Sequence, residues 1–197
     1  MRFDLGLTGS IGMGKSTTAA LFADRGCAVW DADAAVHELY KSKAKGADAI
    51  FALCPDAVTS DGVDRQRLKA AIAENPALLP QIEAVIHPLV AEHRAEFRAT
   101  ATADIRVFDI PLLFEKGSEA EFDAVACVSA PAHLQRERVL ARPNMTDQNL
   151  EMILAKQMPN AKKAARSDYV IDTTSHATAE ADVDRIIADI KDRLSHA

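Results

Sequence analysis

The chain has 197 residues, of which 48 % are hydrophobic and 26 % are charged, with a formal net charge of −6 at pH 7. This length and usage suit a single globular unit with insertions, and the acidic balance argues against nucleic acid or an anionic membrane as a partner. We expect neither a secretory signal nor a membrane span, and three widely separated cysteines favour reduced thiols in the cytoplasm.

Five short apolar runs, separated by helical patterns, predict an α/β fold. The runs are residues 5–8, 28–30, 105–110, 124–129 and 169–171. The helical pattern at residues 17–24 stops before Gly26, a residue typical of helix C-termini, and the last pattern, at residues 183–194, has one apolar face. Buried strands that alternate with helices indicate a five-stranded parallel sheet with helices on both faces. Ligands of such sheets bind beyond the carboxyl ends of the strands.

Two longer stretches interrupt this alternation within the single unit 1–197. Residues 37–103 are too long for a simple crossover, and their patterns predict a helical insertion beside the sheet. Residues 142–167 are polar and basic and include Lys162 and Lys163. This composition predicts a mobile lid over bound phosphates, although a solvated helical hairpin would have the same composition. The nucleotide-binding core then comprises residues 1–36, 104–141 and 168–197.

A glycine-rich string follows the first apolar run and reads Gly9-Ser10-Ile11-Gly12-Met13-Gly14-Lys15-Ser16. It satisfies the G-x-x-x-x-G-K-[ST] pattern of a phosphate-binding loop, at the place where a strand passes into a helix. Its glycines let successive backbone N–H groups point at one anion, and the helix dipole favours the same anion. We therefore expect the loop and Thr17 to bind a nucleoside triphosphate, with Lys15 on the terminal phosphates and the Ser16 hydroxyl on Mg²⁺.

A phosphate loop is shared by switches, motors and small-molecule kinases. The chain has no Asn-Lys-x-Asp string of the guanine-nucleotide switches, and its length offers a motor ATPase little room for coupling elements. A small-molecule kinase needs a second polar site, a group that orients the attacking hydroxyl, and arginines that neutralise charge. The sequence has candidates for each of these roles.

Three carboxylates stand at the ends of apolar runs. Asp31 and Asp33 follow the second run and can face the crevice, where one could take the proton of a substrate hydroxyl and the other could act on Mg²⁺ through water. One of them could instead cap the following helix. Asp109 ends the third run, where an acidic residue would hold Mg²⁺ through water; the alternative is a carboxylate hydrogen-bonded to nearby backbone.

Four cationic or titratable side chains are further candidates. Arg138 and Arg142 are four residues apart and share a helix face, from which guanidinium groups could stabilise the transferring phosphoryl group. A surface role is the alternative for Arg138, whereas Arg142 stands at the hinge of the predicted lid. His87-Pro88 is expected to break the helical pattern of residues 78–99, which could aim His87 into the acceptor cleft or leave it exposed. Arg65 is a weaker candidate for the same cleft.

Together these features resemble the dephospho-coenzyme A kinase family. The motifs that carry the resemblance are Gly6-Leu7-Thr8 with the phosphate loop, Asp31-Ala32-Asp33, Gly62-Val63-Asp64-Arg65, His87-Pro88, Pro111-Leu112-Leu113-Phe114-Glu115, Gln135 with Arg138 and Arg142, Gln157, and Asp168-Tyr169-Val170-Ile171-Asp172. They cover nearly the whole chain. Ser10 and Met13 depart from the family at variable loop positions, and Thr173 stands where asparagine is common, which leaves an adenine contact there open.

The resemblance implies a P-loop kinase fold with a helical substrate-binding insertion and a lid. ATP, with Mg²⁺, would phosphorylate the ribose 3′-hydroxyl of dephospho-coenzyme A, giving coenzyme A and ADP in the final step of coenzyme A biosynthesis. A nucleoside or nucleotide kinase on the same scaffold is the alternative. The only partner that we expect is this small-molecule substrate. We expect the protein to be a monomer or a weak homo-oligomer.

The resemblance also implies roles for individual residues. Asp33 would be the general base, Lys15 and Arg142 would act on the transferring phosphoryl group, and Ser16 and Asp109 would serve Mg²⁺. The residues implied for the acceptor substrate are Asp31, Arg65, His87, Pro111, Leu112, Glu115 and Arg138.

Overall fold

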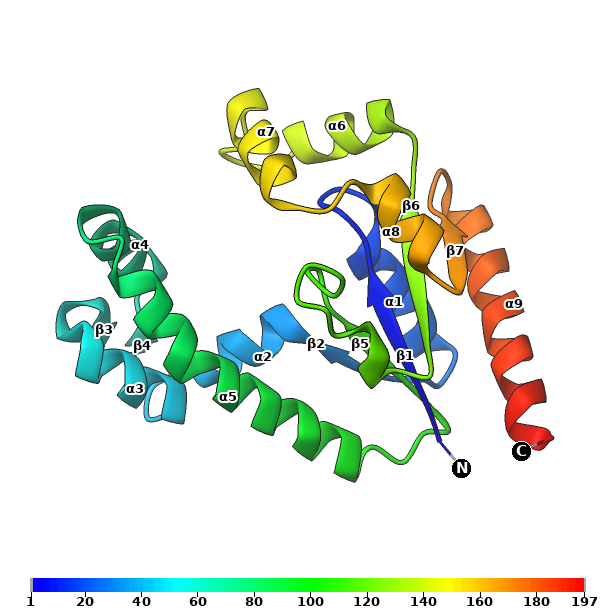
Figure 1. The fold of residues 1–197 in the computed structure, drawn as a ribbon, viewed down its shortest axis with the longest axis horizontal. Coiled ribbons are helices and arrows are strands. Elements are labelled where there is room, and N and C mark those ends of the chain that lie inside the picture. Colours follow the sequence, from blue (N-terminus) through cyan, green and yellow to red (C-terminus); the bar gives the residue numbers. More distant parts are fainter. Residues whose placement is uncertain (1, 197) are drawn as a thin grey trace. The chain divides into compact units, whose positions relative to one another are not determined.

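The computed structural model describes residues 2–196 and divides into two compact units (Figure 1). The first unit consists of Met1–Trp30 and Ala101–Ala197, and the second of Asp31–Thr100. The second unit overlaps most of the stretch predicted as an insertion at residues 37–103, but it begins earlier, at Asp31, and ends earlier, at Thr100. Among the described helices, none combines the length and the apolar character needed to cross a membrane.

A five-stranded parallel sheet lies at the centre of the first unit, in the order β2-β5-β1-β6-β7 (Figure 1). Its strands are β1 (Phe3–Thr8), β2 (Ala28–Asp31), β5 (Ile105–Asp109), β6 (Ala124–Ser129) and β7 (Tyr169–Asp172). All five predicted strands are confirmed. In the register of the central strands, Leu7 pairs with Asp109 of β5 and with Ala126 of β6. The loop after β1 therefore leaves the sheet beside Asp109.

Helices cover both faces of this sheet. The helical elements of the first unit are α1 (Lys15–Asp24), η2 (Glu119–Glu121), α6 (Ala132–Leu140), α7 (Asp147–Lys156), α8 (Asn160–Arg166) and α9 (His176–Ser195). Side chains alternate along a strand, so Ala124 and Ala126 of β6 join a core cluster with α1 and α9, whereas Val125 packs on the opposite face against Leu113 and Phe114. On α9, the fully buried Ile186 stabilises this core by about 1.5–3 kcal/mol.

The second unit is mostly helical and has its own core. Its elements are α2 (Ala32–Leu39), α3 (Lys45–Leu53), η1 (Pro55–Ala57), the antiparallel pair β3 (Val58–Thr59) and β4 (Gly62–Val63), α4 (Arg65–Glu74) and α5 (Leu78–Thr100). The core cluster contains Ile50 of α3, Leu68 of α4, and Ile82 and Ile86 of α5.

The predicted helix break at His87-Pro88 is wrong, because α5 continues through Pro88. A proline inside a helix removes one hydrogen bond and costs about 3 kcal/mol. Ile86 before the proline and Leu89 and Val90 after it all pack in the same cluster. Burial on both sides of Pro88 outweighs the local cost and keeps the helix continuous.

Candidate active site

The glycine-rich loop opens directly into the N-terminus of α1. Gly14 is the N-cap residue, with a left-handed φ of 88° and no side-chain hydrogen bond to the helix. The first N–H groups of α1 therefore have no side-chain cap and can bind an anion. Gly12 also has a positive φ of 76°, and a Cβ atom there would lie 2.5 Å from Val139 Cγ2. The loop thus needs glycine for conformation at both positions and for space at Gly12.

We expect Gly12→Ala to destabilise the protein more than Gly26→Ala. Both glycines have a positive φ, but a Cβ at Gly26 would meet nothing within 4 Å. Gly26→Ala should cost about 1–2 kcal/mol of unfolding free energy for the left-handed conformation, and Gly12→Ala about 1–3 kcal/mol more for overpacking. Urea denaturation of the two variants measures the difference; equal losses would contradict the close packing described at Gly12.

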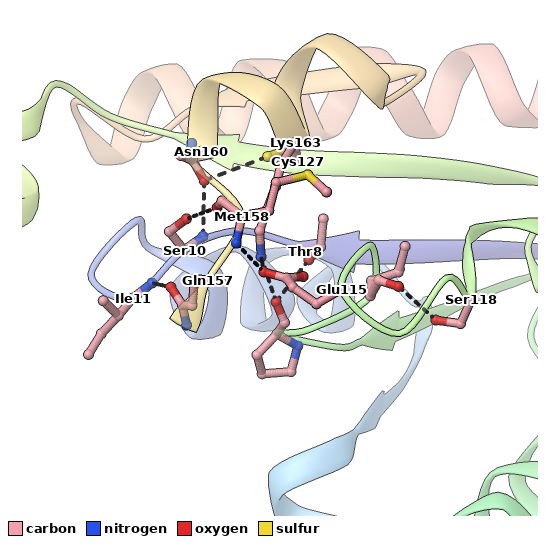
Figure 2. A network of polar contacts seen from close by, with 12 residues as sticks. Thr8, Ser10, Ile11, Glu115, Ser118, Cys127, Gln157, Met158, Asn160 and Lys163 are labelled. Atoms are coloured by element: carbon pink, nitrogen blue, oxygen red, sulfur yellow. Dashed lines mark hydrogen bonds and ion pairs between the residues drawn. The ribbon is translucent and has the colours of Figure 1, made fainter. Parts of the chain in front are cut away.

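Side-chain amides from two other segments hold the first half of the loop, and Figure 2 shows those of Gln157 and Asn160. The Ser10 N–H donates to Asn160 Oδ1 (2.9 Å), and the Ile11 N–H donates to Gln157 Oε1 (3.0 Å). On the other side, Gln135 Nε2 donates to the Ile11 carbonyl (2.8 Å). Since the backbone N–H groups of Ser10 and Ile11 already have acceptors, we expect phosphate to be bound by the second half of the loop and by the first turn of α1.

The two unusual loop residues both have structural partners. Met13 is 5 % exposed, and its sulfur accepts a hydrogen bond from the Ala130 N–H at 3.2 Å. Ser10 is 3 % exposed, and its hydroxyl donates to the Met158 carbonyl at 3.4 Å. These side chains point into the protein, so the departures at variable positions leave the phosphate-facing groups unchanged.

Lys15 and Asp109 form an ion pair at the carboxyl edge of the sheet. The Asp109 side chain is only 1 % exposed, whereas Ser16, the next residue of α1, is exposed. The Ser16 hydroxyl and the Asp109 carboxylate are oxygen donors, the kind that Mg²⁺ prefers while it keeps several waters. The chemistry of this donor set therefore fits the predicted metal.

A pocket of about 400 Å³ adjoins the loop. It is lined by Gly12, Gly14, Thr17, Thr18, Arg138, Arg142, Thr173, Ser175, His176 and Ala179. Its volume lies in the range typical of small-molecule sites. The structure thus brings Arg138 of α6 and Arg142, which follows the C-terminal end of this helix, to one pocket. Their spacing of four residues predicts this.

Thr173 supports the loop from the end of β7. It is 6 % exposed, and its hydroxyl donates to the Met13 carbonyl at 2.7 Å. Its own carbonyl accepts a hydrogen bond from Arg138 Nη2 at 2.6 Å. Thr173 therefore links the loop to Arg138: its hydroxyl binds the Met13 carbonyl of the loop, and its carbonyl binds the Arg138 guanidinium.

Ser175 and His176 line the pocket but were not among the residues predicted from the sequence. A capping box begins α9, in which the Ser175 side chain accepts from the Thr178 N–H and the Thr178 side chain accepts from the Ser175 N–H. A serine shortly after the last apolar run is a signal for this helix start, because serine is a preferred N-cap residue. This signal would have predicted that Ser175 and His176 lie at the carboxyl edge of the sheet.

Four of the other predicted residues lie in the second unit. Asp31 caps α2, since its side chain accepts from the Ala34 N–H at 2.9 Å, so the capping alternative holds for Asp31. Asp33 is exposed in the first turn of α2. The Arg65 guanidinium lies 5.9 Å from the centre of the Tyr40 ring. His87 is exposed on the continuous helix α5.

The turn after β5 contains the remaining predicted acceptor residues. The Pro111 carbonyl accepts from the Thr8 hydroxyl at 3.3 Å and from Lys163 Nζ at 2.8 Å. Leu112 is 37 % exposed, whereas Glu115 is bound internally by Lys163. Of these three, Leu112 offers its side chain to solvent.

The predicted lid contains two helices that differ in how they are held. Leu150 is the one residue of α7 that is buried. Helix α8 packs against β6, and its Lys163 is fully buried. We therefore expect lid motion to be confined to α7 and its flanking residues.

Hydrogen exchange tests this division of the lid. With ADP and the acceptor bound, amides of α7 should exchange more slowly than in the free protein, while amides of α8 should change little. The exchange rates can be followed peptide by peptide with mass spectrometry. Equal slowing in α7 and α8 would show that both helices move as one lid.

Comparisons with known proteins agree with this arrangement. The family model for dephospho-CoA kinase matches residues 3–179. A dephospho-CoA kinase of Ruegeria pomeroyi is 59 % identical over 199 residues, which cover 100 % of both chains. The crystal structure of a Thermus thermophilus protein matches with a TM-score of 0.80 and 30 % identity, covering 95 % of this chain and 97 % of that one.

A second solved structure, a dephospho-CoA kinase from Campylobacter jejuni, has the same fold. It matches with a TM-score of 0.69 and 21 % identity, over 96 % of this chain and 98 % of that one. The family match spans nearly all of the chain and includes the glycine-rich loop and the stretches predicted as an insertion and a lid. The chain therefore belongs to the dephospho-CoA kinase family.

Proposed function

We propose that the protein transfers the γ-phosphoryl group of ATP to the ribose 3′-hydroxyl of dephospho-coenzyme A, giving coenzyme A and ADP as the last step of coenzyme A biosynthesis. The observation that carries this proposal is the 59 % identity with a dephospho-CoA kinase over the full length of both chains. The intact phosphate loop and the adjoining pocket support it, because they provide a nucleotide site in the first unit.

In this proposal the first unit binds ATP. The uncapped N-terminus of α1 and Lys15 bind the β- and γ-phosphates, and the pocket lined by Arg138 and Arg142 takes the nucleoside part. Arg142 then stabilises charge on the transferring phosphoryl group when the lid closes. We assign Arg138 to the nucleotide rather than to the acceptor, because it binds the Thr173 carbonyl beside the loop.

Ser16 directly, and Asp109 through water, would hold Mg²⁺ on the phosphates. When bound, this ion supplies positive charge that neutralises the phosphate oxygens. Lys15 provides a second, permanent charge from the protein. Its ion pair with Asp109 keeps the ammonium group at the edge of the sheet before the nucleotide arrives.

The acceptor would be bound by the residues that the family resemblance implies for it. Asp33 takes the proton of the 3′-hydroxyl, and its exposed carboxylate is free to do so. The residues proposed to contact the acceptor are Asp31, Arg65, His87, Pro111 and Leu112. Glu115 supports the turn after β5 from inside.

The acceptor specificity can be tested by incubating the protein with Mg-ATP and a panel of alcohols and phosphates. The panel contains dephospho-coenzyme A, adenosine, AMP and shikimate, and ADP release is measured for each. We expect ADP release with dephospho-coenzyme A to exceed that with every other acceptor. Preferential ADP release with a nucleoside or a nucleotide would assign the protein to that kinase class instead.

We further propose that the enzyme acts in the cytoplasm as a monomer or weak homo-oligomer. All three cysteines, Cys27, Cys54 and Cys127, are free thiols. Burial raises the pKa of the Cys27 and Cys127 thiols to about 11, so both stay protonated and unreactive at neutral pH. Such thiols suit a reducing compartment.

A further inference from the structure

Lys163 is a buried lysine that the proposed phosphoryl transfer does not use. Its side chain is 0 % exposed, and Nζ donates to Glu115 Oε1 at 2.9 Å and to the Pro111 carbonyl at 2.8 Å. A buried ammonium group is strongly destabilising unless such partners compensate for the lost water. Its neighbour Lys162 is exposed. Only one lysine of the basic pair is therefore part of the core.

Glu115 extends this contact to the backbone of the lid segment. The oxygen that accepts from Lys163, Oε1, also accepts from the Met158 N–H at 2.7 Å. Burial opposes the charge on Glu115, but the hydrogen bonds from Lys163 and Met158 outweigh it and lower the pKa of this carboxyl. The Glu115 carboxyl is therefore charged at neutral pH, and its hydrogen bond to the Met158 N–H fixes the position of residue 158.

Residues 157–160 in turn hold the phosphate loop (Figure 2). Gln157 and Asn160 accept the N–H groups of Ile11 and Ser10, and the Met158 carbonyl accepts the Ser10 hydroxyl. Asn160 is itself held, because its Nδ2 donates to the Val128 carbonyl of β6 at 3.1 Å. A chain of direct contacts thus runs from the buried lysine to the loop.

We propose that Lys163 and Glu115 are positioning residues for the phosphate loop. The ion pair fixes residues 157–160, and these residues hold Ser10 and Ile11 so that the loop is preorganised for the nucleotide. The inference rests on the nucleotide-binding role proposed for the loop. A ligand binds less tightly when binding must also order its site, so losing the pair should weaken nucleotide affinity.

The test compares Lys163→Met with the matched control Lys162→Met. Both remove one positive charge from α8, but only the first removes a buried contact. At a temperature where circular dichroism shows folded protein, Lys163→Met should raise the Kd for ADP about tenfold, the factor expected for one lost hydrogen bond. The Ser10 and Ile11 amides should exchange faster with solvent in this variant, and Lys162→Met should behave like the wild type.

A purely structural Lys163 would give a different result. Lys163→Met would then lower the midpoint of unfolding, but the ADP Kd of the folded protein and the exchange of the two loop amides would not change. That outcome would overturn the proposal.

The double variant Lys163→Met/Glu115→Met separates positioning from stability. Replacing both members of a buried ion pair with apolar residues is often neutral or stabilising, so this variant should fold even if Lys163→Met does not. Its ADP Kd should still be about tenfold higher, because the Met158 N–H has lost its acceptor. Wild-type affinity in the folded double variant would contradict the proposal. ADP binding involves no acceptor, so a wrong acceptor assignment leaves this test unaffected.

Discussion

Asp33→Asn should lower kcat by about 10²–10⁴-fold, the contribution usual for a general base. The amide has nearly the same shape but cannot take a proton from the acceptor hydroxyl. Asp33 is exposed in the first turn of α2, and asparagine there removes only a favourable interaction with the helix dipole, about 0.3–1 kcal/mol. Steady-state kinetics should therefore show a large loss of kcat, while ATP affinity and folding stay close to wild type.

Asp48→Asn is the matched control for this prediction. Asp48 is also an exposed acidic residue in the first turn of a helix of the second unit, α3. It should lose the same small helix-dipole interaction and keep full turnover. Near-normal kcat in Asp33→Asn would remove Asp33 from the mechanism, whereas equal losses in both variants would point to a general effect of charge.

Lys15→Met should reduce kcat/KM for ATP by about 10²–10³-fold, because one preorganised charge on the phosphates is lost. It should also destabilise the folded protein. The substitution takes the ion-pair partner from Asp109, which is 1 % exposed, and a buried carboxylate that loses a partner costs about 1–3 kcal/mol. Urea denaturation and steady-state kinetics measure the two effects separately.

The double variant Lys15→Met/Asp109→Asn distinguishes these two contributions. Removing the buried charge should restore much of the stability, but turnover should remain low because the lysine proposed for the phosphates and the carboxylate proposed for Mg²⁺ are both gone. The control is Lys191→Met on the exposed side of α9, which should change neither quantity. An active double variant would show that the lysine serves only to neutralise Asp109.

The sheet and the phosphate loop could be predicted from the sequence because their signals are local. A continuous apolar run such as residues 124–129 predicts a strand buried on both faces, and the structure confirms it. The loop pattern specifies its own turn and the following helix. The family match and the solved structures confirm the P-loop kinase fold expected from the resemblance.

The buried Lys163 could not be predicted in this way. Its contact with the Pro111 carbonyl joins residues 52 positions apart, and α8 has only seven residues, too few for a clear apolar face. Beside Lys162, it belongs to a polar and basic segment that predicts a mobile lid or, as the alternative, a solvated helical hairpin. Which lysine of the pair is buried depends on how α8 lies against β6, and no local pattern carries that information.

The continuous helix α5 is a second example of tertiary packing outweighing a local rule. Proline disfavours helix at His87 and at itself, but Ile86 and Leu89 are anchored in a core built from α3, α4 and α5. The short β3–β4 pair was missed because each strand has two residues, although the Asp61-Gly62 dipeptide is a turn signal. The roles proposed for Asp33, Arg65 and His87 stay predictions.

The most direct test of the proposed reaction identifies the atom that receives the phosphoryl group. The protein is incubated with Mg-ATP and dephospho-coenzyme A, and the products are followed by ³¹P nuclear magnetic resonance. We predict one new phosphomonoester on the ribose 3′-oxygen for each ADP formed. ATP consumption without that phosphomonoester, or phosphate on any other atom, would contradict the proposed function.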